Sequence, residues 1–571
     1  MKRHLQFGLG MGLLFSLLVT ACGGGSDQPA ATATANPTGT SASSTATRVA
    51  PTVAPTATQA PRPTPTAAVS AGEVNVALTT LGNFVLNPGV AGDNLYTDAM
   101  YDHLIGTDPD GNLQPESGFV TSWSTNADST IWTVKVRDNL VFHNGDKATS
   151  KDAAYTLELS IDPKAPYSRA GDLRRSISKL ETPDDSTLVI TLTGTDIYWH
   201  ITWLGKNPPN GTVKTVLPRN YSTTVGTDGA NKAPVGTGPY KFKSVTVGDR
   251  IVTEAAGKHF FFGVPKTRTL TFLNVAEEQT RMGLLTTGAA DLAPITATNE
   301  TKAKQSGLSI VLKKDYLITA VWSGQYPDVI SGYGPNPLVN ENVRKALFFY
   351  AIDRKALVDS FLGGKATVTM DFGVSTWDIT GAFTPLPIPP YDPAKSKALL
   401  AEAGYAKGFE LDAYVVPNST PGPEAMEAVI VYWENLGIKV NRLNGAVFSA
   451  ALAANYNKAG FPKPTVYGLS IAGNQAINSG RPIGFHNPLA IFSLDRDPEG
   501  LRLGTEFLQA KTVDAYKKAG EAYRQWSYEH AKGWAPLFSN QELWARSNKI
   551  SASWRMGRDP YYRLGDAAAL P

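Results

Sequence analysis

Cysteine is almost absent from this chain, which has one, Cys22, among 571 residues. A single cysteine excludes a disulfide within the chain and a metal site built from clustered thiolates. The stability of the fold must therefore come from packing. Hydrophobic residues make up 42% of the sequence and aromatic residues 10%, and the length exceeds that of one typical core, so we expect two or more packed domains.

Histidine is sparse, and the motifs of common exported hydrolases are missing. The chain has no His-Glu-x-x-His, no Gly-x-Ser-x-Gly and no Walker lysine loop. Its seven histidines lie at least 40 residues apart, at His4, His103, His143, His200, His259, His486 and His530. We therefore predict that the protein is not an enzyme and uses no cofactor or metal. The alternative is an exported hydrolase acting on a peptide or glycan, because distant residues can still meet in a folded site.

An excess of charge of one sign is also lacking. Lysine and arginine total 53 against 50 acidic residues, for a net charge of +3. Nucleic-acid binding requires lysine and arginine clustered on one face, and no stretch of this sequence is dense enough in them. The sequence therefore predicts no nucleic-acid partner.

The N-terminal apolar run is too short for a comfortable membrane span, which needs about 20 apolar residues. Lys2 and Arg3 precede the apolar run 9–19, a pattern typical of a secretory signal. Residues 18–22, Leu-Val-Thr-Ala-Cys, resemble a bacterial lipobox, which implies lipidation of Cys22 and a lipoprotein signal peptide over 1–22. An ordinary cleaved signal with an incidental cysteine is the alternative. We expect an anchor on the outer face of the cytoplasmic membrane, with several acyl chains holding it stably.

Residues 23–71 lack aromatic residues and carry only three charged ones, Asp27, Arg48 and Arg62. The segment is rich in threonine, alanine and proline, so it cannot bury a core and is predicted to be a disordered tether. A flexible chain of this length reaches on the order of 40 Å. That reach would let a folded body move freely above the membrane.

What the chain does have is a clear strand, turn and helix within residues 115–159. Trp132, Val134 and Val136 alternate with polar residues, which is the period of a half-buried strand extending to about Phe142. Residues 143–146, His-Asn-Gly-Asp, favour a tight turn. A helix should follow, with Thr149 or Ser150 as its N-cap and a carboxylate three residues after Thr149 near its positive end.

The residues of this stretch resemble the signature of the family 5 extracellular solute-binding proteins, the peptide, nickel and oligosaccharide class of ATP-binding cassette (ABC) importers. The matching residues are Pro115, Ser122, Trp123, Phe142, His143, Gly145, Thr149 and Asp152. The resemblance extends from about residue 87 to 440. It implies an α/β, two-lobed periplasmic-binding-protein-like fold (type II, large family 5 variant), with an extra subdomain in the first lobe. It also implies a monomer that closes on a solute between its lobes and presents it to membrane permease subunits, while a separate subunit binds ATP.

The expected boundaries follow from the resemblance and from the pattern of elements. Lobe I should span 72–268, with the inserted subdomain at about 105–190, lobe II should span 269–533, and 534–571 should return to lobe I. Residues 270–292 read as strand, helix, strand, one βαβ unit that we expect to open the second lobe. The two crossings between lobes are predicted at 266–270 and 534–538.

The segment Gly236-Thr237-Gly238-Pro239-Tyr240 contains Gly-x-Gly, which can hold phosphate. A nucleotide site is not favoured here, because a third glycine is missing, Pro239 lacks an amide donor and a strand pattern follows instead of a helix. We predict a tight turn between elements. Gly-Thr-Gly-Pro-Tyr is also a hallmark of the resembled family.

Three helices are predicted in the second lobe from three-and-four apolar spacing and their end signals. They cover 342–361, 392–403 and 423–436, and each ends at a glycine. Arg344 and Arg354 lie in the first of these helices. We interpret both as structural ion-pair partners in preference to ligand contacts.

Candidate ligand contacts come mostly from the resemblance. Asn94 and Tyr101 flank or lie on a helix-like segment, 95–104, and could face a ligand, although Tyr101 could equally pack on its own helix. Trp322 and Ser323 follow a predicted strand, 316–321, where the family often has a ligand-facing asparagine. Trp377 lies in a loop that the family directs at the cleft.

The last candidate, Asn474, bears on the kind of ligand. Peptide binders of the family carry Trp-x-x-Asp after a strand, and the aspartate meets the free ammonium of the peptide. In the register we favour, Ile471 and Asn474 replace these residues, and a neutral amide is a poor partner for a buried ammonium. The sequence therefore predicts a neutral or anionic ligand, with an oligosaccharide slightly ahead of a blocked or unusual peptide.

Overall fold

The structure is a computed structural model. It describes residues 72–91, 96–108, 113–164, 170–205, 215–324, 329–330, 333–370, 383–415, 423–444, 463–472, 497–532 and 534–551. The signal peptide, the tether and four predicted site residues, Cys22, Asn94, Trp377 and Asn474, lie outside these ranges. Among the described residues, no helix is both long and apolar enough to cross a bilayer.

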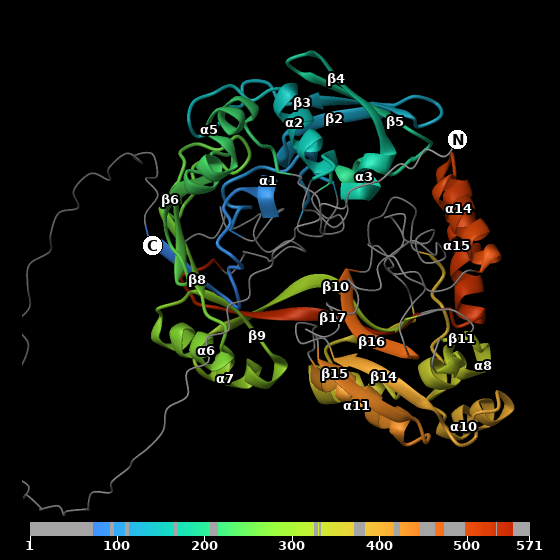
Figure 1. The fold of residues 1–571 in the computed structure, drawn as a ribbon. Coiled ribbons are helices and arrows are strands. Elements are labelled where there is room, and N and C mark those ends of the chain that lie inside the picture. Colours follow the sequence, from blue (N-terminus) through green and yellow to red (C-terminus); the bar gives the residue numbers. More distant parts are fainter. Residues whose placement is uncertain are drawn as a thin grey trace, which may run out of the picture. The chain divides into compact units, whose positions relative to one another are not determined.

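One large mixed sheet carries the fold (Figure 1). Its strand order is β15-β14-β16-β10-β17-β9-β1-β8-β7-β6, and β13 pairs with β17 at its side. Parallel pairs, such as β1 with β8, occur together with antiparallel ones, such as β10 with β17. The strands are β1 (Glu73–Leu78), β6 (Tyr240–Thr246), β7 (Arg250–Ala255), β8 (Thr269–Asn274), β9 (Leu292–Ile295), β10 (Ser309–Gly324), β13 (Thr367–Val368), β14 (Glu410–Val415), β15 (Lys439–Asn444), β16 (Thr465–Ala472) and β17 (Trp534–Arg546). Helices connect many of these strands, so the predicted α/β class is confirmed.

Among the described residues, the helices range from four to 17 residues in length. They are α1 (Pro88–Ala91), α2 (Ser150–Ile161), α3 (Ala170–Ser176), α4 (Trp199–Trp203), α5 (Arg219–Lys232), α6 (Glu278–Thr287), α7 (Glu300–Gln305), α8 (Glu341–Arg344), α9 (Arg354–Leu362), α10 (Pro393–Glu402), α11 (Pro423–Glu434), α14 (Pro498–Leu508) and α15 (Val513–Glu529). Short 3-10 turns occur at Pro115–Ser117, Ala297–Asn299 and Pro337–Val339, and a two-stranded ribbon is formed by β11 (Val329–Ile330) and β12 (Gly334–Pro335).

A separate four-stranded sheet, β2-β3-β5-β4, contains the signature stretch. Its strands are β2 (Val120–Thr125), β3 (Ile131–Val136), β4 (Ile177–Asp184) and β5 (Thr187–Leu192). As predicted, Trp132, Val134 and Val136 are the buried residues of β3, although the strand ends at Val136 instead of extending to Phe142. We call this sheet with α2 and α3 the subdomain; its core includes Phe119, Trp132, Val134, Leu157 and Leu188.

Helix α2 begins as the sequence predicts. The side chain of Thr149 accepts a hydrogen bond from the Lys151 amide, and the Asp152 carboxylate accepts one from the Thr149 amide, which together form a capping box. Just before it, Gly145 has a φ of 91°, so the Asn-Gly turn is built on backbone that favours glycine. Local chemistry alone therefore accounts for this turn and helix start.

The predicted βαβ unit is present, but it belongs to the sheet around β1. Strands β8 and β9 both run parallel to β1, which lies between them, and α6 connects the two. β8 pairs with β1 over six residues, from Glu73 with Thr269 to Leu78 with Asn274. The chain at 266–270 therefore continues the sheet of β1 and does not lead away from it. The expected division into lobes at 268 stays a prediction.

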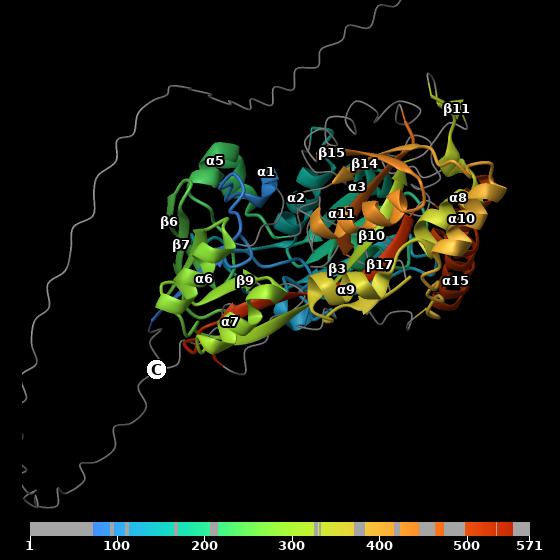
Figure 2. The ribbon, with the colours of Figure 1, turned by 90° about the horizontal axis from the view of Figure 1, so that it is seen from below.

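Two long strands join the β1 end of the large sheet to the β14 end (Figure 2). At one end β17 pairs with β9 through residues 543–546, and at the other β10 pairs with β16 through residues 317–324. β10 and β17 are antiparallel to each other from Ser309 with Arg546 to Trp322 with Trp534. We propose β10 and β17 as the crossings between the lobes, in place of the one expected at 266–270.

Two further cores flank these long strands. The first core is built on β1 and β8 and includes Val74, Val76, Tyr101, Leu270 and Phe272. The second core is built on α9, α11, β14 and β16 and includes Leu347, Leu411, Val429, Trp433 and Val466. Because apolar residues on helices α9 to α11 face β14 to β16, the second core explains the three-and-four spacing seen in the sequence.

The helix predicted over 342–361 is interrupted, so a single helix there is wrong. α8 continues into a π-helical segment, Lys345–Tyr350, and α9 starts afresh at Arg354. The Asp353 side chain accepts a hydrogen bond from the Ala356 amide, and this N-cap starts the new helix. The predictions for α10 and α11 are confirmed: Asp392 caps α10, and Met426, Val429, Ile430 and Trp433 are the buried face of α11.

The segment 95–104, read as helix-like, is not a helix in its described part. Residues 96–100 form a turn, and isolated bridges pair His103 with Thr215 and Ile105 with Gly205. The carbonyl oxygens of Ala99 and Met100 accept hydrogen bonds from the amides of Tyr240 and Gly238. These two carbonyl oxygens thus bond to distant partners and not to the amides of a next helical turn.

Candidate functional site

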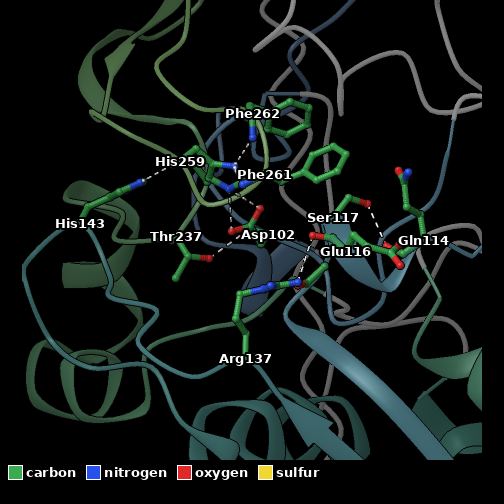
Figure 3. A network of polar contacts seen from close by, with 12 residues as sticks. Asp102, Gln114, Glu116, Ser117, Arg137, His143, Thr237, His259, Phe261 and Phe262 are labelled. Carbon is green, nitrogen blue, oxygen red and sulfur yellow. Dashed lines mark hydrogen bonds and ion pairs between the residues drawn. The ribbon is translucent and has the colours of Figure 1, made fainter.

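A buried polar cluster centres on Asp102 and His259 (Figure 3). The His259 Nε2 lies 3.1 and 3.2 Å from the two carboxylate oxygens of Asp102, and both side chains are at most 2% exposed. The His259 Nδ1 accepts hydrogen bonds from the amides of Phe261 and Phe262. Nδ1 therefore carries no proton, and Nε2 donates its proton to Asp102.

His143 of the signature has a similar role close to this cluster. Its Nε2 donates to the Gly238 carbonyl oxygen at 2.9 Å, and its Nδ1 accepts from the Gly236 amide at 3.3 Å. Burial lowers the pKa of His143, so the ring is neutral near pH 7, as these two bonds require. The histidine of the family signature thus secures the Gly-Thr-Gly-Pro segment.

Arg137 connects the other end of the signature to the same cluster. Its guanidinium donates to the carbonyl oxygens of Pro115, Glu116 and Gly118 and lies 4.3 Å from the centre of the Phe260 ring. Figure 3 shows Arg137 and Glu116 together with Asp102 and Thr237. The cluster holds distant loops together, and its acid and base pair is closed to solvent. We interpret it as structural, not as a reaction centre.

The Gly-x-Gly segment has the structural role that the sequence predicted. A Cβ at position 236 would lie 2.1 Å from the Met100 carbonyl oxygen, and one at 238 would lie 2.6 Å from the Met100 carbonyl carbon. Both glycines are therefore required by close backbone contact. The amide of Gly238 is already bonded to Met100 and is not available to a phosphate.

Tyr101 is 2% exposed and packs in the first core, with its hydroxyl 3.5 Å from the Leu86 carbonyl oxygen. Burial raises its pKa. This is the packing role that the sequence left open beside a ligand contact. Among the described residues, no group of three or more histidine, cysteine, aspartate or glutamate side chains is placed to hold a metal ion.

Arg344 and Arg354 are both buried, and both donate to backbone carbonyls. Arg344 bonds to the carbonyl oxygens of Leu338, Val339, His530 and Ala531. Arg354 bonds to those of Phe348, Phe349 and Pro536. The structural interpretation of these arginines fits these contacts, with carbonyl oxygens as the partners where we had expected carboxylates.

The strand register places positions 322 and 323, occupied by Trp322 and Ser323, on opposite faces of the sheet. Ser323 pairs with Val466, and Val321 pairs with Ala535; both partners are fully buried in the second core. Because successive strand positions face opposite sides of a sheet, position 323 lies on the face of that core. Position 322 lies on the other face, which makes it the better candidate of the two.

Position 322 is paired with an aromatic residue on each of the two neighbouring strands. It pairs with Tyr467 of β16 and with Trp534 of β17, so the three positions form one row across three strands. We call Trp322, Tyr467 and Trp534 the aromatic row. Sequence reasoning missed Tyr467 and Trp534 because cross-strand register joins residues that are up to 212 positions apart. No pattern within a single stretch of the sequence signals this pairing.

The comparisons with known proteins agree with this architecture. Residues 114–462 match the family described as Bacterial extracellular solute-binding proteins, family 5 Middle. The chain is 27% identical over 515 residues to the glutathione-binding protein GsiB of Escherichia coli O1:K1 / APEC, an alignment that covers 86% of this chain and 93% of the relative.

Solved structures of similar fold cover most of the chain. The ABC transporter substrate binding protein CtaP (Lmo0135) of Listeria monocytogenes matches with a TM-score of 0.72 at 18% identity, over 87% of this chain and 99% of that one. The periplasmic binding protein DppA of Helicobacter pylori, in complex with the peptide STSA, matches with a TM-score of 0.68 at 18% identity, over 86% and 97%. The predicted periplasmic-binding-protein fold is confirmed.

Proposed function

The chain belongs to the family 5 bacterial extracellular solute-binding proteins, and from that premise we propose that it captures a peptide-like solute outside the cytoplasm and delivers it to an ABC importer. Members of this family are binding receptors without catalytic activity, so the alternative of an exported hydrolase is set aside. The buried, structural character of the Asp102 and His259 pair agrees with a binding role.

A peptide-like solute is favoured over the oligosaccharide that the sequence placed slightly ahead. The relative GsiB is named for glutathione, and DppA was solved with a peptide. The observation within this chain that carries the proposal is the aromatic row, because the rings of tryptophan and tyrosine bind apolar or planar groups and can also donate hydrogen bonds. A neutral residue at 474 still favours a peptide without an ordinary free α-ammonium, such as a blocked or atypically linked one.

The ligand and the row are tested together by titration calorimetry. We expect binding of N-acetylated or atypically linked di- to pentapeptides, and Trp322→Ala should weaken it by about 1–3 kcal/mol, as is typical of a lost packing contact at a site centre. Ser323→Ala is the matched control, because position 323 lies on the opposite face of the sheet and should leave affinity unchanged. Trp377→Ala is expected to weaken binding by a similar amount if its loop reaches the cleft.

Two results would change this assignment. Binding of short oligosaccharides but of no peptide would move the solute to the second class that the sequence allowed. Micromolar binding of ordinary peptides that is lost on N-acetylation would show that another acidic group holds the ammonium, and would remove the argument from Asn474.

The membrane anchor is the second part of the proposal. If Cys22 is lipidated, Cys22→Ser should move the protein from the membrane fraction to the soluble exported fraction, and solute affinity should not change because the 49-residue tether separates anchor and body. Fractionation followed by immunoblotting measures this, with Ser26→Ala as a control outside the lipobox. Retention of Cys22→Ser in the membrane fraction would contradict the lipobox interpretation.

A further inference from the structure

A proline-rich segment leads into α10 over residues 383–392, with the sequence Phe-Thr-Pro-Leu-Pro-Ile-Pro-Pro-Tyr-Asp. We call it the proline strap. It forms neither helix nor strand. From 384 to 392, only Tyr391 is neither a proline nor the residue before a proline. Proline fixes φ at about −65° and restricts the preceding residue to extended conformations, so the covalent structure of the strap favours polyproline II.

Burial along the strap repeats every three residues, which is the period of polyproline II. Phe383, Leu386 and Pro389 are buried, and all the residues between them are exposed. Since polyproline II has three residues per turn, the three buried side chains lie along one edge. Leu386 belongs to the second core, and Phe383 packs edge-to-face on Phe507 of α14, with ring centroids 6.3 Å apart. One edge of the strap therefore packs against the protein, and the other two edges face outward.

Hydrogen bonds fix both ends of the strap. The Thr384 amide donates to the Glu521 carboxylate at 2.7 Å, and the Thr384 carbonyl oxygen accepts from the Arg524 guanidinium at 3.2 Å. At the other end, the Asp392 amide donates to the Tyr350 carbonyl oxygen at 2.8 Å. The strap is thus held extended before any partner arrives, so a partner that binds it loses little conformational entropy.

The outward edges carry apolar side chains and free backbone acceptors. Ile388 is 51% exposed and Tyr391 is 46% exposed, and their spacing of three residues places them on one edge with Pro385. The Tyr391 ring lies 5.5 Å from the ring of Tyr432 on α11. Within the described part of the chain, the carbonyl oxygens of Pro387 and Ile388 accept no hydrogen bond. Aromatic grooves bind polyproline II through such edges and carbonyl oxygens.

Positive charge flanks the C-terminal end of the strap. Lys395 and Lys397 are both exposed at the start of α10, and Lys397 makes no ion pair with any described residue. The one carboxylate of the strap, Asp392, is already used as the N-cap of α10. A second copy of this chain would bring like charges together here, whereas a partner with acidic side chains would be complementary.

From these contacts we propose that the proline strap is a docking element for the permease subunit of the importer, and that an aromatic-lined, acidic groove on the outer side of that subunit receives it. This rests on the proposed function, because a receptor that delivers its solute to an importer must bind the permease from outside. The outward row of Pro385, Ile388 and Tyr391 fills the groove, the free carbonyl oxygens accept hydrogen bonds from it, and the lysines meet its acidic side chains.

Photo-cross-linking in the producing organism tests where the strap binds. Ile388 or Tyr391 is replaced by p-benzoylphenylalanine in the full, exported chain, and cross-linked peptides are identified by mass spectrometry after irradiation of whole cells. We expect adducts from both positions with an extracytoplasmic segment of the permease subunit. Val247 is the matched control, because it is apolar and 78% exposed but lies in the turn between β6 and β7. A label there should give no permease adduct.

The strength of the contact is measured with the purified importer in proteoliposomes. The concentration of this protein that half-saturates ATP hydrolysis should rise about tenfold in Ile388→Glu, as for one central interface residue, and the maximal rate should not change. Val247→Glu should behave as wild type. Both substituted positions are exposed, so both variants should fold, which circular dichroism checks, and solute affinity by calorimetry should stay at the wild-type value.

Permease adducts absent at 388 and 391, or adducts that map instead to a second copy of this chain or to another protein, would overturn the docking assignment. Equal half-saturating concentrations for Ile388→Glu and Val247→Glu would overturn it as well. Failure of the proposed function has a different signature, since the wild-type protein would then bind no peptide in calorimetry. Normal peptide binding without a permease adduct contradicts the docking role of the strap alone.

Discussion

Gly236→Ala is expected to lower the free energy of unfolding by about 3 kcal/mol or more, because the new methyl group has no space. Its position would be 2.1 Å from the Met100 carbonyl oxygen and 2.8 Å from the ring of Tyr101. Neither neighbour can easily move. Met100 accepts the Gly238 amide, and Tyr101 is enclosed in the first core. Denaturant unfolding followed by tryptophan fluorescence measures the loss.

Gly194→Ala provides the control for this substitution. Gly194 is exposed, its φ is not positive, and no atom lies within 4 Å of the Cβ it would gain. Its effect should stay within about 0.5 kcal/mol. Equal effects of the two substitutions would show that Met100 and the Gly-Thr-Gly-Pro segment are not in rigid contact in solution.

Arg354→Ala should cost a comparable amount, about 3–4 kcal/mol, because it leaves three buried carbonyl oxygens without their donor. These belong to Phe348 and Phe349 at the end of the π-helical segment and to Pro536 of β17. Burial lowers the pKa of Arg354 to about 10, so the guanidinium stays charged at neutral pH. Arg354→Lys should recover only part of the loss, since one ammonium cannot reproduce the geometry of a guanidinium fork.

The adjacent Lys355 gives a control on the same helix. Its ion pair with Asp359 is exposed, with 79% and 51% of the two side chains accessible, so Lys355→Ala should change stability by less than about 0.5 kcal/mol. Solute affinity of the folded Arg354→Ala protein should be unchanged. A loss of affinity without a loss of stability would instead make Arg354 a ligand contact and contradict its structural assignment.

Much of the local structure was predictable from residues close together in sequence. The alternation in β3, the capping box of Thr149 and Asp152, and the aspartate cap and glycine end of α10 each depend on contacts within a few residues. Such contacts are the same in any fold that contains the element, so the pattern is sufficient. The family resemblance was equally accessible, because its motifs are contiguous.

The two incorrect helix predictions share a different physical cause. The segment 95–104 has the spacing of a helix, yet the carbonyl oxygens of Met100 and Ala99 bond to the amides of residues 238 and 240. The helix predicted over 342–361 breaks at 351–353, where the capping bond of Asp353 and the bonds of Arg354 to Pro536 favour a new helix start. In both places, partners more than 130 residues away outweigh a local preference of a few tenths of a kcal/mol per residue.

The sequence by itself determined the α/β class, the family and the expectation of a lipid-anchored binding protein, because composition and contiguous motifs carry those properties. Tertiary structure alone decided which residues meet. It placed Asp102 against His259, bonded His143 to the Gly-Thr-Gly-Pro segment, and put positions 322 and 323 on opposite faces of the sheet. Each of these contacts joins residues from separate elements, and their register and docking depend on the packing of whole cores, which no single stretch of the sequence encodes.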